Sequence, residues 1–171
     1  MAENEDSEDT YIDRPNRRKA SSKATKAFVA FLLIASAVLM IIISIGGWGT
    51  LEGAKPIQIA YILLYLLMAF LVMRWNRGVL PLAAALAIVL LIFAAVSGPA
   101  WFDRDKTGFT SPALDESILG LLSLILVPLQ ILLIAFAMRG FQQAWNVEVE
   151  RTRDERDDYD RGGGAPAPAA A

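Results

Sequence analysis

Four long stretches without a charged residue limit what this chain can fold into. They cover about residues 27–47, 57–73, 79–97 and 117–138, and none contains Asp, Glu, Lys or Arg. A helix of about 20 apolar residues, rising about 1.5 Å per residue, covers the ~30 Å hydrocarbon core of a bilayer. We therefore predict an all-α integral membrane protein, with a four-helix transmembrane bundle within residues 27–147.

The first stretch is better described as a retained span than as a soluble helix or a signal peptide. A helix of a soluble bundle needs a polar face that recurs about every 3.6 residues, and residues 28–45 have no such face. A cleaved signal peptide has a shorter basic segment, a shorter apolar run and a small-residue cleavage site. Residues 46–52 lack that site, so we expect the first stretch to stay in the protein as its first span.

The positions of the basic residues predict the orientation. Lys and Arg in short loops favour the cytoplasmic side of a membrane. Basic residues are frequent in the N-terminal tail, in the turn 74–78 and after the fourth span. The loops 48–56 and 98–116 have few basic residues or have acidic residues that balance them. We expect both termini in the cytoplasm and, from an Ala-rich, Cys-free composition, a bacterial cytoplasmic (plasma) membrane.

Each of the four tryptophans stands at the end of a different span. Trp48 and Trp101 fall at the predicted outer ends of spans one and three, and Trp75 and Trp145 at the inner ends of spans two and four. Tryptophan is enriched at the headgroup level of membranes. The sequence therefore predicts that these four side chains anchor the spans at the two interfaces.

The segments around the spans have distinct compositions. Residues 1–26 form an acidic and then basic cytoplasmic tail, whose first 13 residues we expect to be disordered. Glu and Arg three residues apart predict a charged cytoplasmic helix over 148–161, and residues 162–171 predict a flexible low-complexity tail. A Ser-Pro pair at 111–112 predicts the start of the fourth helix, and the short turn 74–78 predicts an antiparallel hairpin of spans two and three.

Polar side chains recur at helical spacing on two spans. Gln58, Tyr61 and Tyr65 share one face of span two, and Ser123 and Gln130 share one face of span four. Lipid tails cannot form hydrogen bonds, so these faces should meet protein or a cavity. We expect them to pack inside the bundle; a midplane pocket for a lipid-like molecule or a quinone is the other interpretation.

Small residues are spaced four apart on span three. The pairs are Ala83 with Ala87 and Ala94 with Gly98. This spacing lets helix backbones approach closely. It predicts tight packing, either within the chain or with a partner.

The residue types that are missing restrict the chemistry. The chain has no Cys and no His, so it lacks disulfides, thiolate nucleophiles, thiolate zinc sites and the usual general base near neutral pH. We expect no enzymatic activity, no catalytic, metal or cofactor-binding residues, and no nucleic-acid partner. The expected partners are the lipid bilayer and other membrane proteins or further copies of the chain.

Two functions are consistent with these features. The first is a non-enzymatic accessory or scaffold subunit of a larger membrane assembly, because no ionisable Asp, Glu, Lys or Arg lies within a span while the tails are charged. The second is a small transporter or channel, alone or as a homodimer, for a neutral or lipid-like substrate. Proton-coupled transport normally requires an acidic residue or a histidine within the membrane, which the spans lack.

Overall fold

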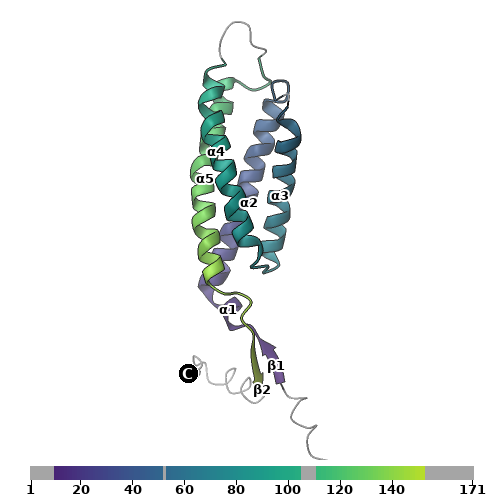
Figure 1. The fold of residues 1–171 in the computed structure, drawn as a ribbon, viewed down its shortest axis with the longest axis vertical. Coiled ribbons are helices and arrows are strands. Elements are labelled where there is room, and N and C mark those ends of the chain that lie inside the picture. Colours follow the sequence, from purple (N-terminus) through teal and green to yellow (C-terminus); the bar gives the residue numbers. More distant parts are fainter. Residues whose placement is uncertain (1–9, 52, 105–110, 153–171) are drawn as a thin grey trace, which may run out of the picture.

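Four long helices make up most of the protein (Figure 1). The computed structural model describes residues 10–51, 53–104 and 111–152. Each long helix contains nearly all of one predicted stretch, and each is long and apolar enough to cross a membrane. The helices, here called the helical domain, are α2 (Ala20–Gly46), α3 (Lys55–Met73), α4 (Val79–Phe102) and α5 (Glu116–Gln142). A short helix, α1 (Pro15–Arg18), precedes them.

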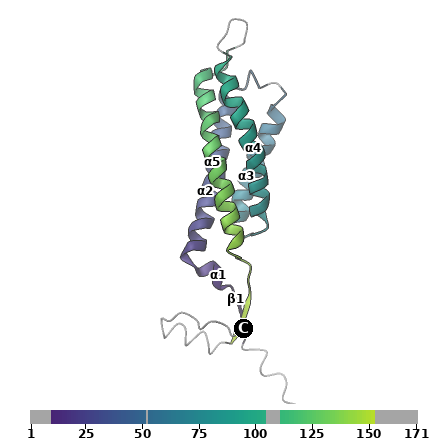
Figure 2. The same cartoon turned by 60° about the vertical axis from the view of Figure 1, so that its left-hand side comes forward.

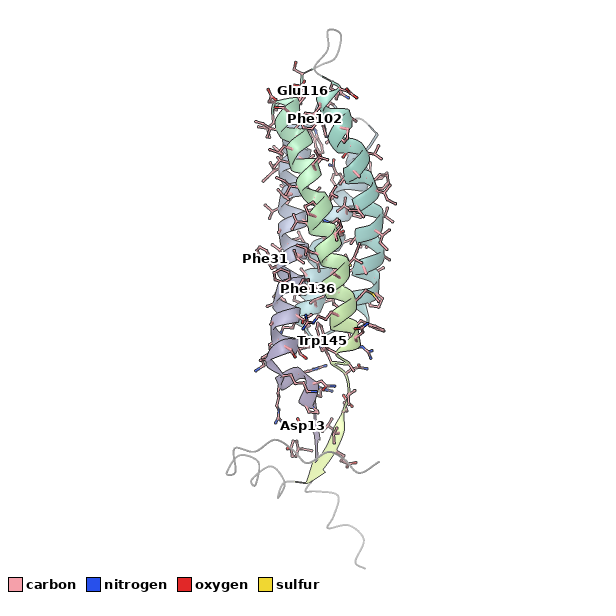
Figure 3. The ribbon with its side chains drawn as sticks, turned by 90° about the vertical axis from the view of Figure 1, so that its left-hand side faces the viewer. Asp13, Phe31, Phe102, Glu116, Phe136 and Trp145 are labelled. Atoms are coloured by element: carbon pink, nitrogen blue, oxygen red, sulfur yellow. The ribbon has the colours of Figure 1, made fainter. Side chains whose placement is uncertain are left out.

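Large apolar side chains cover the outside of all four helices. Ile45, Leu63, Val96 and Leu121 are exposed, one on each helix from α2 to α5. Figure 3 shows Phe31 of α2 projecting away from the helices. An apolar surface that surrounds a protein favours contact with lipid over contact with water. The exterior therefore agrees with the length and composition of the helices.

The helices do not pack in the order of the chain. Contacts between α4 and α5 are the most extensive, α2 packs on both α3 and α5, and α3 and α4 touch only sparsely. The predicted hairpin of spans two and three is therefore joined by a short turn but is not a closely packed pair (Figures 1 and 2). We call the loosely packed boundary between these two helices the α3–α4 seam.

Small residues explain why α4 packs on α5. Ala83, Ala87, Ala94 and Gly98 are all buried within the chain. A Cβ atom on Gly98 would lie 2.6 Å from Leu124 Cδ2, and one on Gly120 would lie 3.1 Å from the Gly98 carbonyl oxygen. The small-residue spacing thus serves close packing inside the protein, where van der Waals contact is the main attraction between helices in lipid.

The fourth helix begins later than predicted. The N–H groups of Ala113 and Leu114 both donate to the Gly46 carbonyl oxygen, at 2.9 and 3.1 Å, which ties this segment to the end of α2. The helix starts at Glu116, because the Asp115 carboxylate accepts from the Ser117 N–H at 2.8 Å and from its hydroxyl. Ser117 donates both of these hydrogen bonds, and they lower the pKa of the Asp115 carboxyl.

The two ends of the described chain pair as strands. β1 (Thr10–Asp13) runs antiparallel to β2 (Val149–Thr152), with Ile12 opposite Glu150. The predicted helix over 148–161 is therefore wrong at its start, and residues 10–13 are ordered rather than disordered. β-Branched residues in both segments favour strand, and pairs of opposite charge three residues apart favour a helix by only about 0.2–0.5 kcal/mol each. Residues 1–9 and the predictions for 153–171 lie outside the described chain.

Hydrogen bonds and ion pairs join the segment around β1 and α1 to the segment that follows α5. Arg14 Nε lies 2.9 Å from Glu148 Oε1, and Arg18 Nη2 lies 2.8 Å from Asp13 Oδ1. Asn16 Nδ2 donates to the Ala144 carbonyl oxygen at 3.1 Å, and Arg17 Nε donates to the Trp145 carbonyl oxygen at 3.0 Å. We call β1, α1 and residues 143–152 the terminal arm; it extends from one end of the helices (Figure 1).

The close approach of α4 and α5 predicts the effect of enlarging Gly120. Gly120→Val should lower the free energy of unfolding by about 1–3 kcal/mol, because overpacking forces rigid neighbours apart. Phe102 Cε2 would lie 2.8 Å from the new Cβ, and the Gly98 carbonyl oxygen 3.1 Å from it. Thermal unfolding in detergent measures the change. Gly49→Val is the matched control, because a Cβ at Gly49 meets no atom within 4 Å; equal shifts for both variants would contradict this packing.

Candidate functional site

A hydrogen-bonded cluster of three polar side chains lies at the centre of the helical domain. Gln130 Nε2 donates to Ser36 Oγ at 2.9 Å, and the Tyr65 hydroxyl donates to Gln130 Oε1 at 2.9 Å. All three residues are fully buried. They come from α2, α3 and α5, so one side chain links three helices. We call Ser36, Tyr65 and Gln130 the central polar cluster.

This cluster brings together two predicted site residues and one that the sequence does not single out. Tyr65 and Gln130 both point into the protein, as the interpretation of packing inside the bundle expects. Ser36 gives no comparable signal, because a lone serine in an apolar helix usually bonds back to its own backbone. The signal that points to it is the unused hydrogen-bonding capacity of a buried glutamine, which needs both a donor and an acceptor nearby.

The cluster links α2, α3 and α5 through neutral hydrogen-bonding groups. Its members are neutral, each has a partner, and no acid or base lies among them to activate the hydroxyls. Hydrogen bonds between helices in membranes contribute about 0.6 kcal/mol on average. Three helices fixed at one level by directional bonds have a defined register, which dispersion contacts alone specify less sharply.

A pocket lies one helical turn from the central polar cluster, on the side remote from the terminal arm. Its volume is about 290 Å³, and residues of α2, α3, α4 and α5 line it. Met40, Tyr61 and Leu126 line it and stand four residues from Ser36, Tyr65 and Gln130 respectively. The central polar cluster therefore forms the layer directly below the pocket.

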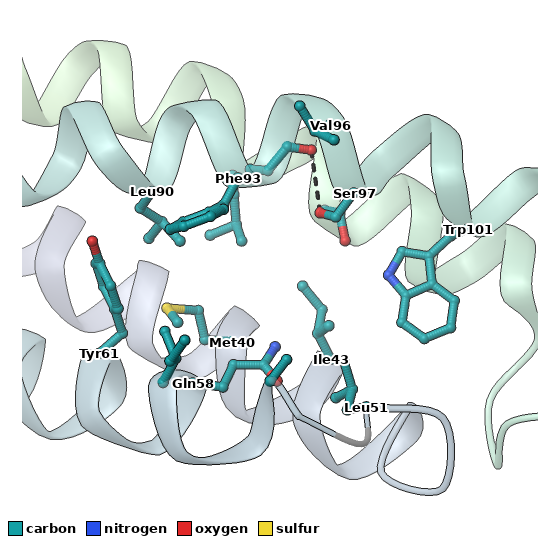
Figure 4. Close-up of a pocket in the computed structure, with 15 residues that line it drawn as sticks. Met40, Ile43, Leu51, Gln58, Tyr61, Leu90, Phe93, Val96, Ser97 and Trp101 are labelled. Carbon is teal, nitrogen blue, oxygen red and sulfur yellow. Dashed lines mark hydrogen bonds between the residues drawn. The ribbon is translucent and has the colours of Figure 1, made fainter.

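The other three predicted polar residues line this pocket. Gln58, Tyr61 and Ser123 are all among its lining residues, together with Ser97 and Trp101 (Figure 4). The predicted faces are thus divided between two places: Tyr65 and Gln130 belong to the packed cluster, and the other three belong to the cavity. Tyr65 and Gln130 thus pack inside the protein, whereas a pocket for a lipid-like molecule or a quinone stays a prediction.

The hydrogen-bonding groups of the pocket are few and neutral. Ser123 Oγ donates to the Leu119 carbonyl oxygen at 2.8 Å, and Ser97 Oγ donates to the Ala94 carbonyl oxygen at 3.4 Å. Gln58 Oε1 is buried and accepts no hydrogen bond from the part of the chain that the structure describes. The indole nitrogen of Trp101 faces the pocket (Figure 4). The described lining residues include no Asp, Glu, Lys or Arg.

The tryptophans stand at the helix ends, as predicted, but two of them are buried inside the protein. Trp101 lines the pocket and packs over Gly47, and Trp145 is fully buried beneath the helices. The Trp145 ring meets the Trp75 ring edge-on, with centroids 5.3 Å apart, and its Nε1 donates to Gln143 Oε1 at 3.0 Å. Their rings thus contact protein, and the anchoring of the spans by these two tryptophans stays a prediction.

The remaining two tryptophans are more exposed and carry cations. Lys55 Nζ lies 4.9 Å from the centroid of the Trp48 ring, at the pocket end of the helices. Lys26 Nζ lies 4.2 Å from the centroid of the Trp75 ring, at the terminal-arm end. An amphipathic ring beside a lysine matches the residues that stand at membrane interfaces. The anchoring role of Trp48 and Trp75 stays a prediction.

Comparison with protein-family models, curated proteins and solved structures finds no match. Within residues 10–51, 53–104 and 111–152, no group of three His, Cys, Asp or Glu side chains is arranged to hold a metal ion.

The central polar cluster predicts unequal effects of removing its members. Tyr65→Phe removes one hydrogen bond and should lower the free energy of unfolding by about 0.6 kcal/mol. Gln130→Leu removes two and leaves the Tyr65 hydroxyl buried without its acceptor, so it should cost about 1–3 kcal/mol. Reversible unfolding in mixed micelles measures both values.

A double variant tests directly whether the contributions of Tyr65 and Gln130 to stability are coupled. Tyr65→Phe with Gln130→Leu should cost less than the sum of the single variants, because no unpaired tyrosine hydroxyl remains. Gln142→Leu is the control, since this exposed glutamine lies outside the cluster. Equal stability of Gln130→Leu and Gln142→Leu would contradict a structural role for the cluster.

Proposed function

We propose that the chain is a non-enzymatic four-span protein of the cytoplasmic membrane, with both termini in the cytoplasm. We further propose that it serves as an accessory or scaffold subunit of a larger membrane assembly. The observation that carries this proposal is the terminal arm, a structured element at one end of an otherwise lipid-adapted helical domain. The side chains of the central polar cluster are neutral and hydrogen-bonded to one another, which favours a structural role over an enzymatic one.

The basic residues at the arm end support the cytoplasmic orientation. Pairing of β1 with β2 brings both ends of the described chain to one side of the helices. Lys26 Nζ donates to the Met73 carbonyl oxygen at 3.2 Å, and Arg77 Nε donates to the Phe141 carbonyl oxygen at 2.8 Å. Basic groups from the N-terminal tail and the 74–78 turn thus meet at the arm end, which is the asymmetry expected of a cytoplasmic side.

The terminal arm has the properties of a docking element for an extended segment of another membrane protein. Its described sheet has two strands, and β2 pairs with β1 along one edge while no described residue pairs with its other edge. Such an edge offers N–H and C=O groups to an added strand. On the neighbouring strand β1, the Ile12 side chain is 64% exposed. A two-stranded sheet is only marginally stable alone, so a third strand would also stabilise the arm.

A transport function is less consistent with the layer below the pocket. A substrate that crossed the helical domain from the pocket would have to part the hydrogen bonds of the central polar cluster. The three side chains are fully buried, so solvent does not reach them between α2, α3 and α5. A pocket with a closed floor favours retention of a ligand over its passage.

Mild-detergent purification of the full chain from its native membrane tests the proposed role. Stoichiometric membrane-protein companions are expected in mass spectrometry. Glu150→Pro should reduce their recovery several-fold, because proline removes an N–H either from the β1–β2 ladder or from the open edge. Glu150→Ala is the matched control and should retain the companions. A protein that is stable without companions, or equal recovery with both variants, would refute docking through the arm.

The orientation can be tested with single cysteines, because the chain has none of its own. A membrane-impermeant maleimide added to intact cells should label Gly53→Cys and leave Lys19→Cys unlabelled until the membrane is permeabilised. Both positions are exposed in the structure, so access to the reagent depends on the side of the membrane. Labelling of Lys19→Cys in intact cells would contradict the proposed orientation and indicate the opposite one.

A further inference from the structure

We propose that the pocket at the α3–α4 seam binds one neutral lipid with a hydroxyl-bearing headgroup. The chain of this lipid lies between the two helices, and its hydroxyl meets Gln58. This site is separate from the terminal arm and does not require a partner protein.

The size of the pocket suits part of a lipid molecule. An apolar protein cavity of about 150 Å³ admits benzene, and this one measures about 290 Å³. From Gln58 to the level of Tyr65 is about two helical turns, or about 10 Å. This depth holds the part of a hydrocarbon chain next to the headgroup, while the rest of the chain continues through the seam.

The opening of the pocket faces the region of lipid chains. Ile57, Phe93 and Val96 line the pocket and are also exposed on the outside of α3 and α4; Val96 is 68% exposed. Few contacts join these helices to each other. An amphiphile can therefore enter sideways from the bilayer with its chain in hydrocarbon throughout, and only its headgroup must lose water.

The polar groups of the pocket lie where a lipid headgroup would be. Gln58 is in the first turn of α3 and Trp101 is in the last turn of α4, so both are at the end of the helices. Met40, Tyr61 and Leu90 line the deeper part (Figure 4). The lining is thus polar at the end of the helices and, apart from the Tyr61 hydroxyl, apolar towards the central polar cluster, as a lipid is polar at its head and apolar along its chain.

The chemistry of these groups selects a hydroxyl. Gln58 Oε1 is buried without a donor among the described residues, and an unsatisfied buried acceptor costs free energy until a donor reaches it. A hydroxyl supplies that donor, and its oxygen can accept from an indole N–H such as that of Trp101. Because no charged residue of the described chain lines the pocket, a charged headgroup would lose its hydration without compensation.

Photolabelling of the full chain in liposomes tests the proposal. The probe is a monoacylglycerol with a diazirine near the head of its acyl chain, and labelled peptides are identified by mass spectrometry. Saturable labelling of α3 and α4 is expected, with displacement by unlabelled monoolein and much weaker displacement by oleate. Labelling that does not saturate would mean contact with bulk lipid only, and equal displacement by oleate would refute selection of a neutral head; either result overturns the proposal.

Two variants test separately the hydrogen bond between the lipid hydroxyl and Gln58 and the space that the pocket offers to the lipid. Gln58→Leu should weaken the apparent affinity for the probe about fivefold, the effect of one ordinary hydrogen bond, and Gln142→Leu should leave it unchanged. Ala94→Phe should abolish saturable labelling by filling the pocket, which Ala94 lines. Wild-type affinity in Gln58→Leu would overturn the proposed contact even if Ala94→Phe failed to fold. None of these results depends on whether companion proteins bind the arm.

Discussion

The close approach of α4 and α5 determines how the other helices are arranged. Gly98 and Gly120 let the two backbones come close enough that a single added methyl group would meet a carbonyl oxygen at 3.1 Å. Attraction between helices in lipid depends on such contact, because lipid chains are as apolar as the side chains. Since α4 packs its small residues against α5, it has little contact with α3, although only a short turn separates α3 and α4 in the chain. The α3–α4 seam and its pocket are consequences of that preference.

The central polar cluster limits how far this seam extends. Gln130 bonds to residues of α2 and α3 at once, so it holds α3 against the other helices one turn below the pocket. Without it, α3 would be joined to the rest of the helical domain mainly by apolar contacts with α2, which specify depth in the membrane only weakly. The central polar cluster therefore sets where the pocket ends. The cluster fills the interior at its own level, and the pocket is the unfilled space one helical turn away.

The sequence predicts the helices well and their partners poorly, for a physical reason. A span is a local property, because the length and apolarity of residues 79–97 suffice to predict a helix there. The direction of Tyr65 and Gln130 also follows, since a polar side chain avoids lipid. The bond to Ser36, the burial of Trp145 and the pairing of Ile12 with Glu150 require knowledge of which segments meet. Local charge spacing favours a helix where β2 forms. Pairing with the distant strand β1 outweighs these local charge pairs, so the segment is a strand instead.

The strand pairing of the terminal arm also orders events during synthesis. β1 precedes all four long helices in the chain and β2 follows them, so the hydrogen bonds between Thr10–Asp13 and Val149–Thr152 can form only after the last helix has left the ribosome. Contacts between residues so distant in sequence form late in folding. A partner that recognises the paired arm would therefore ignore chains that are partly inserted and recruit only finished ones. The arm would then act as a checkpoint for assembly, reporting at one end of the protein that every helix is in place.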